Sequence, residues 1–148
     1  MEGVFLSPMI TYNSLNVDVP AACTPRLSRW IEQVARTYQK VVGEVNYVFV
    51  DDAEILRLNR EFLGHDYFTD HIGFDRSRGR ILSGDIYISL DTVRTNGELY
   101  AADAPDSYMA EFHRVVIHGL LHLCGIKDKT PEERQQMEQA ENKALALL

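Results

Sequence analysis

The stretch EVNYVFVDDAEILRL, residues 44–58, predicts a β-strand that leads directly into an α-helix. Residues 44–50 are rich in β-branched and aromatic side chains, as buried strands usually are. Asp51 and Glu54 follow with the spacing of a helix capping box. Apolar residues then recur at helical spacing, at Ile55, Leu58 and Phe62. We therefore expect a strand that ends at Asp51 and a helix that begins there.

One further strand and one further helix are predicted upstream of this unit. Residues 4–15 are strand-like, although Pro8 interrupts them. Residues 24–39 predict a helix, because Thr24 suits the N-cap and Pro25 suits the first helical position.

Downstream, a hairpin and two helices are predicted. The runs FTDHIGF (68–74) and ILSGDIYISL (81–90) are typical of strands, and the polar stretch DRSRGR between them is typical of a hairpin turn. The C-terminal part of the chain predicts a helix from Asp106 to Cys124, ended by Gly125. A second helix is expected from Thr130 onward, because Pro131 suits the first helical position and Glu133 completes a capping box with Thr130.

These elements favour one α+β domain over residues 1–148, in which a small mixed sheet of about four strands packs with helices. A chain of 148 residues that is 45% hydrophobic and 25% charged suits a single folded core. No apolar run approaches the roughly 20 residues of a membrane span, and no targeting segment is recognisable. Cys23 and Cys124 are too few for a disulfide framework. We therefore expect a cytoplasmic protein.

The net charge of −7 argues against a surface built for non-specific nucleic-acid binding. Any contact with RNA must therefore be local. Basic residues concentrate at Arg57 and Arg60, at the arginines of residues 76–80, and at Lys127 and Lys129. A solvated charged face is the ordinary interpretation of each group. If the protein binds RNA, we expect the arginines to gather into a positive cleft.

The stretch HGLLHLCGIKD, residues 118–128, has the ligand spacing of a metal site in the C-terminal half of the chain. His118 and His122 are four residues apart, so their imidazoles project from one helix face. Gly125 can turn the chain sharply, which brings Asp128 back toward the histidines. Three such ligands leave a coordination position for water, as in catalytic zinc sites. The alternative is that the histidines are partly buried on an amphipathic helix and that Asp128 belongs to a polar turn.

The same stretch lacks the glutamate of zinc peptidases. Gly119 follows His118, where those enzymes carry their general base, so peptide hydrolysis is disfavoured. A metal could still activate water for phosphodiester cleavage without that glutamate. Cys124 and His113 lie off the face of His118 and His122, and a small buried thiol is the better interpretation of Cys124.

Three segments of the chain resemble motifs of the YbeY family and occur in the same order along the sequence. Members of this family are bacterial metal-dependent endoribonucleases. HGLLHLCGIKD resembles the family motif His-Gly-x-Leu-His-Leu-x-Gly-Tyr-Asp-His. Upstream, LNREFLGHDYFTDHIGF (58–74) is similar to Leu-Asn-x-x-Tyr-Arg-x-x-Asp-x-x-Thr-Asp-Val-Leu-Ser-Phe, and GDIYIS (84–89) is similar to the family's Gly-Asp-Ile strand. The matched segments run from about Leu58 to Asp128.

The resemblance implies a single-strand-specific endoribonuclease that acts in 16S rRNA 3'-end maturation and ribosome quality control. It implies that His118 and His122 are ligands of one Zn²⁺ per chain, and that Asp128 stands where most members have a third histidine. The partners it implies are single-stranded RNA, rRNA above all, and the small ribosomal subunit in the cytoplasm, with no membrane and no DNA. An aspartate ligand makes such a site harder and could broaden the choice of metal.

Two departures from the family motifs bear on catalysis. The family's basic residue corresponds here to Leu63, so its charge is missing. Arg60, about one helical turn earlier, is the candidate catalytic residue that could supply it. The family's Thr-Asp-Val corresponds to Thr69, Asp70 and His71.

Two other functions stay open at this point. One is a zinc-dependent hydrolase of another class, such as a peptidase that takes its base from Asp70 or His71. The other is a ribosome-assembly factor that binds its partner and carries a structural metal. A catalytic site keeps an exchangeable water on the metal, whereas a structural site is closed by four protein ligands. The sequence names three ligands, which favours catalysis.

Overall fold

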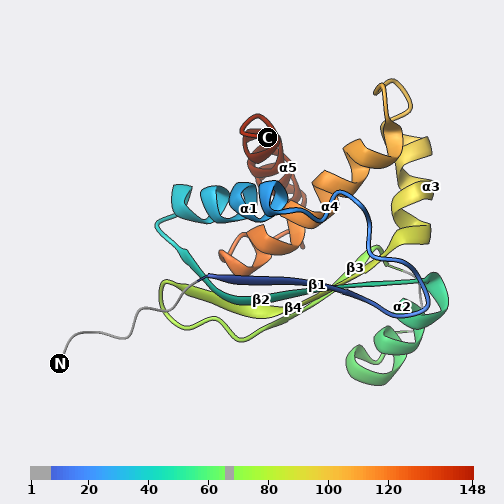
Figure 1. The fold of residues 1–148 in the computed structure, drawn as a ribbon, viewed down its shortest axis with the longest axis horizontal. Helices are drawn as coiled ribbons and strands as arrows, with labels where there is room; N and C mark the ends of the chain where they lie inside the picture. Colours follow the sequence, from blue (N-terminus) through green and yellow to red (C-terminus); the bar gives the residue numbers. More distant parts are fainter. Residues whose placement is uncertain (1–7, 66–68) are drawn as a thin grey trace.

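The computed structural model describes residues 8–65 and 69–148, which form a four-stranded mixed sheet with helices packed on it (Figure 1). The strands are β1 (Met9–Ser14), β2 (Val41–Val50), β3 (His71–Asp75) and β4 (Ile81–Ser89). Their order in the sheet is β1-β2-β4-β3, with β1, β2 and β4 parallel and β3 antiparallel to β4. The predicted α+β class, the mixed sheet and the hairpin of β3 and β4 are confirmed.

The helices precede and follow the β3–β4 hairpin, and the last three follow one another after β4. They are α1 (Pro25–Thr37), α2 (Asp52–Leu58), η1 (Asn59–Leu63), α3 (Leu90–Tyr100), α4 (Ser107–Leu123) and α5 (Pro131–Leu145). In α5 the predicted capping box is present, since Thr130 and Glu133 each bond to the other's backbone N–H. None of the helices in the described part of the chain has both the length and the apolarity that a membrane crossing needs.

The predicted strand–helix unit is confirmed with shifted boundaries. Strand β2 begins at Val41, earlier than expected, so Gly43 lies inside the strand. The side chain of Asp51 accepts a hydrogen bond from the backbone N–H of Glu54 at 2.9 Å and so begins α2. The helix ends at Leu58 and continues as the π-helix η1, which leaves Phe62 exposed rather than on the buried face.

One helix was not predicted, and two predicted segments fall partly outside the described residues. Helix α3 was not predicted, because Thr95, Asn96 and Gly97 are poor helix formers and hide it. Packing against α4 and a cap from the Ser89 hydroxyl, which accepts from the backbone N–H of Thr92, stabilise it. Residues 4–7 of the first predicted strand, and residues 66–68 of the second family motif, lie outside the described residues.

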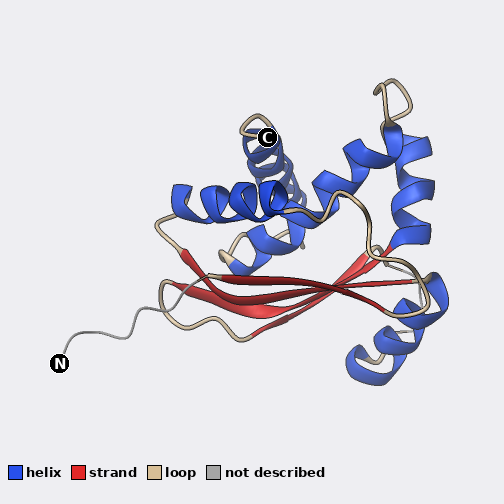
Figure 2. Cartoon of the chain, viewed as in Figure 1, coloured by secondary structure: helices blue, strands red, loops and turns tan. Residues whose placement is uncertain are grey.

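The sheet separates two apolar layers of unequal size, because successive side chains of β2 point to opposite faces. Tyr47 and Phe49 join the large core, which includes buried residues of α1, α4 and α5. Val50 joins a small cluster with residues of α2 and β3 on the other face. Figure 2 shows most of the helices on the first face. The site described below lies where α4 crosses the sheet near β3 and β4.

Gly119 sets the distance between α4 and the sheet. A Cβ at this position would lie 2.8 Å from Cγ2 of Ile86 on β4, closer than side-chain carbons approach. Any side chain here, the peptidase glutamate included, would push the helix away from the sheet. The glycine thus permits the close approach that brings the C-terminal turns of α4 to the start of β3.

Candidate metal centre

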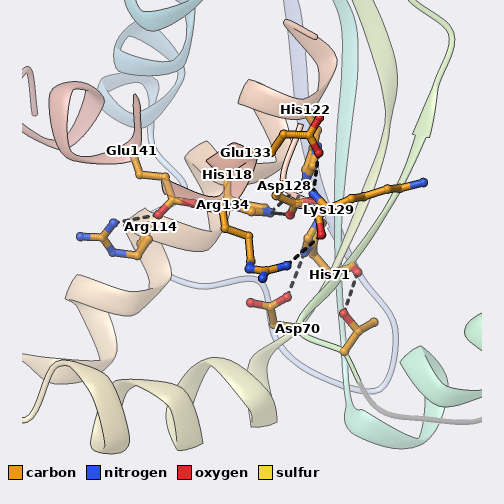
Figure 3. A network of polar contacts seen from close by, with 11 residues as sticks. Asp70, His71, Arg114, His118, His122, Asp128, Lys129, Glu133, Arg134 and Glu141 are labelled. Carbon is orange, nitrogen blue, oxygen red and sulfur yellow. Dashed lines mark hydrogen bonds and ion pairs between the residues drawn. The ribbon is translucent and has the colours of Figure 1, made fainter. Parts of the chain in front are cut away.

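The side chains of His118, His122 and Asp128 converge at the C-terminal end of α4 (Figure 3). The Nε2 atoms of the two histidines are 3.0 Å apart. Oδ2 of Asp128 lies 3.1 Å from Nε2 of His118 and 3.0 Å from Nε2 of His122. The structure therefore brings together all three residues that the motif singled out as ligands.

The turn after α4 places the aspartate. Gly125 has φ +96°, in the left-handed region that favours glycine. Its N–H donates to the carbonyl of His122 at 2.9 Å, and the N–H of Ile126 donates to that of Leu121 at 3.1 Å. These bonds end the helix as predicted and reverse the chain, so Asp128 returns to the helix face that carries His118.

The spacing of the three donor atoms suits a small divalent ion. Zinc binds imidazole nitrogen and carboxylate oxygen at about 2.0–2.2 Å, which in a tetrahedron puts ligand atoms roughly 3.3 Å apart. The observed separations of 3.0 and 3.1 Å are close to that value. Two imidazoles and one carboxylate are also the donor types that zinc accepts. The residues present therefore fit such an ion.

Glu141 on α5 holds His118 in the orientation that a ligand needs. Its Oε2 is 2.5 Å from Nδ1 of His118, and its Oε1 accepts from Arg114 at 2.8 Å. Burial lowers the pKa of His118, but the Glu141 hydrogen bond and the surrounding carboxylate charges outweigh burial and raise it. In the neutral imidazole, with Nδ1 donating to the carboxylate, Nε2 keeps its lone pair for the cluster.

His122 has the opposite electrostatic setting. Burial is the largest cause that lowers the pKa of His122, and the neighbouring His118 lowers it further. A lowered pKa favours the neutral imidazole, which is the form that binds a metal.

His71 at the start of β3 is a fourth donor that the sequence reasoning did not select as a ligand. One ring nitrogen of each of His71, His118 and His122 lies within 4.8 Å of the others. Nδ1 of His71 is 2.9 Å from Oδ1 of Asp70. The available signal was the Thr-Asp-His run at a predicted strand start, but nothing in its spacing linked it to residues almost fifty positions later.

Two cavities flank the cluster. The larger, about 800 Å³, is lined by Asp70, which precedes β3, and by residues of α3, α4 and α5, among them Glu111, Arg114, His118, Arg134 and Glu141. The smaller, about 420 Å³, is lined by Leu63, His71, Gly119 and His122. Asp128 lines both. The candidate metal centre can therefore be reached from two sides.

Glu111, two turns before His118 on α4, is a buried acid on the wall of the larger cavity. Burial, followed by the negative charge of Asp70, raises the pKa of its carboxyl to about 7. The sequence reasoning did not select it, because one glutamate on an amphipathic helix carries no spacing signal.

The predicted arginine cleft is wrong for the arginines of the hairpin. Strand β3 runs away from His71, so the 76–80 turn begins beyond four strand steps, roughly 13 Å along the sheet. Arg76 is paired with Asp85 there. Arg57, in the last turn of α2, forms ion pairs with Glu54 on α2 and with Glu61 on η1.

Two arginines other than the predicted ones lie near the cluster. Arg114 and Arg134 line the larger cavity, whereas Arg60 is exposed on η1 and lines neither cavity among those described. Arg114 is neutralised by Glu141, while Arg134 donates to the carbonyl oxygen of Lys129 at 2.8 Å, a neutral acceptor. Leu63, at the position of the family's basic residue, does line the smaller cavity.

Two residues set aside as non-ligands lie away from the cluster. Cys124 packs against the large core, and burial raises the pKa of its thiol to about 11. The ring of His113 packs edge-on against Trp30 and Phe112.

The fold and the cluster define an α+β protein with a histidine-rich centre suited to one metal ion. The chain matches the family described as Endoribonuclease YbeY over residues 11–148. It therefore belongs to the YbeY family of endoribonucleases, and the resemblance of its three motifs is confirmed.

Relatives in this family cover nearly the whole chain. The Endoribonuclease YbeY of Parabacteroides distasonis is 50% identical over 139 residues, which are 94% of this chain and 95% of the relative. The protein of the same name from Bacteroides thetaiotaomicron is 51% identical over 93% of this chain and 98% of its own length.

A solved structure has the same fold. The solution structure of TM1509 from Thermotoga maritima has a TM-score of 0.61 and 23% identity to this chain. The match covers 93% of this chain and 90% of that protein.

Proposed function

We propose that this protein is a zinc-dependent endoribonuclease that cleaves single-stranded RNA, with rRNA as its substrate. Membership of an endoribonuclease family over residues 11–148 supports the reaction. The observation that carries the proposal for this chain is the convergence of His118, His122 and Asp128 within 3.1 Å. We further propose that it acts in the cytoplasm on the small ribosomal subunit, in the maturation of the 16S rRNA 3' end.

His118, His122 and Asp128 would hold one Zn²⁺ per chain. Bound there, the ion would supply water with a lowered pKa and would polarise a phosphoryl oxygen. Glu141 would keep the His118 ring in its ligand orientation, because its carboxylate accepts from Nδ1.

The larger cavity is our candidate for the RNA strand. It is wide enough, at about 800 Å³, to hold a nucleotide, and Arg134 brings a positive charge to its wall. A cation near the metal would bind phosphate while the rest of the acidic surface repels RNA. The proposal that Arg60 contributes to catalysis stays a prediction, to be compared with Arg134 below.

Peptide hydrolysis has less support, because Gly119 lacks a side chain and its place against Ile86 leaves no room for one. The ribosome-assembly factor with a structural metal also has less support, since two cavities open on the cluster.

A single set of incubations tests the proposal. Zinc-loaded protein is mixed with a single-stranded RNA, a duplex RNA of the same sequence, and an unstructured peptide, each with and without chelator. We expect cleavage of the single strand only, and its loss on chelation. Peptide cleavage, or RNA cleavage that survives metal removal and persists in a His118→Ala, His122→Ala variant, would contradict it.

A further inference from the structure

The position of His71 suits a metal ligand better than a residue that only packs against its neighbours. Its ring lies edge-on to that of His118, with centroids 4.6 Å apart, and stacks on that of His122 at 5.6 Å. Its side chain is 17% exposed, as is that of His118, so both rings are largely withdrawn from water. The residue comes from β3 and thus approaches the cluster from the side opposite α4 and its turn.

Asp70 decides which nitrogen of His71 faces the cluster. Its Oδ1 lies 2.9 Å from Nδ1 of His71. A carboxylate oxygen accepts from a ring N–H, so in the neutral imidazole Nδ1 carries the proton and Nε2 keeps its lone pair.

The same arrangement recurs on the other side of the cluster, where Glu141 accepts from Nδ1 of His118. Two carboxylates thus hold two imidazoles with their lone pairs directed inward. Lone pairs that face one another repel unless a proton or a cation lies between them. A carboxylate behind each ring is the pattern that metal-ligating histidines usually show.

We propose that His71 is a fourth protein ligand of the metal, in addition to His118, His122 and Asp128, and that Asp70 is its positioning residue. This inference rests on the metal site of the proposed function. It also marks a departure from the family motif, which has valine at this position. Four protein ligands would close the site in the resting protein, as in a structural site, so RNA cleavage would require release of His71 or a rise to five-coordination.

His71 is the ligand best placed to move. It belongs to β3, an edge strand of five residues, whereas His118 and His122 belong to a helix buried against the core. The donor nitrogens of His71, His118 and His122 lie within 4.8 Å of one another. A small shift of the β3 end would therefore move the His71 ring relative to the two histidines of α4.

The direct test counts metal-bound ring nitrogens by ¹⁵N NMR of histidine-labelled protein before and after one equivalent of zinc. We expect three Nε2 resonances to move to the metal-bound range in the parent chain, and two in His71→Val. His113→Gln is the matched control, since that ring packs against Trp30, and it should keep three. Two metal-bound nitrogens in the parent would overturn the assignment without any variant.

Zinc affinity, measured by competition with a chromophoric chelator, gives an independent readout. We expect His71→Val to weaken binding at least about tenfold and Asp70→Asn to weaken it less. Because Asp70 acts through His71, adding Asp70→Asn to His71→Val should cause no further loss. Equal affinities of the parent and His71→Val would overturn this inference alone, whereas a parent that binds no zinc would overturn the proposed function with it.

Discussion

Two regions of the chain meet at the histidine cluster, and the rest of the structure holds one of them more firmly than the other. The α4 region contributes His118, His122 and the following turn with Asp128, and Glu141 with Arg114 backs it. The β3 region contributes His71 from a short edge strand, backed by Asp70. A donor on a buried helix is fixed by the core, whereas a donor on a strand end is fixed by few contacts. We infer that the α4 region determines the affinity for the metal. The β3 region, through His71, would control whether water or phosphate can reach the metal.

The largest effect is expected from removing both α4 histidines. A His118→Ala, His122→Ala double variant should contain no zinc, whereas the parent chain should retain roughly one equivalent. Elemental analysis after zinc loading and desalting measures this. His113→Gln, on the same helix but away from the cluster, should retain the parent's metal. Full retention by the double variant would show that the α4 region is not the main anchor.

Asp128 is the next test of the α4 region, because it is the proposed ligand that lies outside the helix. Asp128→Ala should weaken zinc binding by more than the roughly 100-fold that loss of an outer partner can cost. Asp128→His should preserve or tighten binding, since imidazole is a good zinc ligand. Titration against a competing chelator gives both values. If Asp128→Ala binds as tightly as the parent, the third ligand lies elsewhere, and His71 becomes the first candidate.

Glu111 tests the electrostatic cost of burying acids in the α4 region. Its pKa is raised to about 7 from an ordinary 4.5, so below pH 4.5 the folded and unfolded chains both carry the proton. Between these values the unfolded chain ionises first, so stability falls as pH rises, by roughly 3 kcal/mol once pH exceeds 7. Glu111→Gln should remove this loss.

Urea unfolding of the metal-free protein, in chelator and across this pH range, measures the difference between Glu111→Gln and the parent. It should be near zero at pH 4 and largest above pH 7. The exposed Glu138, which lines the same cavity, is the control, and its replacement by Gln should stay within about 0.5 kcal/mol at every pH. A difference that does not depend on pH would mean that Glu111 is not buried as an acid.

Glu141 tests how far the carboxylate behind a ligand controls affinity. Glu141→Gln weakens the acceptor for Nδ1 of His118 and should reduce zinc affinity about 10–100-fold. Arg114→Gln, which removes the ion pair on the other oxygen of Glu141 and a hydrogen bond to Asn142, should have a smaller effect. If the two variants weaken zinc binding equally, the ion pair rather than the imidazole contact is what matters.

The two regions also differ in how well the sequence predicts them. His118, His122 and Asp128 lie within one helix and one turn, so their convergence follows from helical spacing and from the left-handed Gly125. The strand–helix unit at Asp51 follows from local patterns in the same way. Where one element decides the geometry, the sequence is sufficient.

The remaining parts of the site depend on contacts between distant elements. His71 reaches the cluster because β3 pairs with β4 and α4 packs closely over it at Gly119. Glu141 reaches His118 because α5 folds back on α4. Neither contact has a spacing signal in the sequence. The prediction that the hairpin arginines line a cleft at the site was wrong for the same reason. Their position depends on the course of the β3–β4 hairpin, which carries Arg76 away from the site.

The smallest effect concerns the charge that guides RNA to the cluster, where Arg60 and Arg134 are the competing candidates. Each phosphate contact of a single strand adds about 0.7 to the slope of log affinity against log salt, so two to four contacts give a shallow slope. Both side chains are exposed, but Arg134 lines the larger cavity, whereas Arg60 lines neither of the two cavities at the cluster. Arg134→Gln should therefore reduce the slope by about 0.7 and slow cleavage, and Arg60→Gln should change both less.

Fluorescence anisotropy of a labelled oligoribonucleotide from 50 to 200 mM salt, roughly the range over which such slopes are read, measures the binding. If Arg60→Gln has the larger effect, RNA enters past η1 and Leu63 on the β3 side, and the larger cavity is not the RNA-binding one.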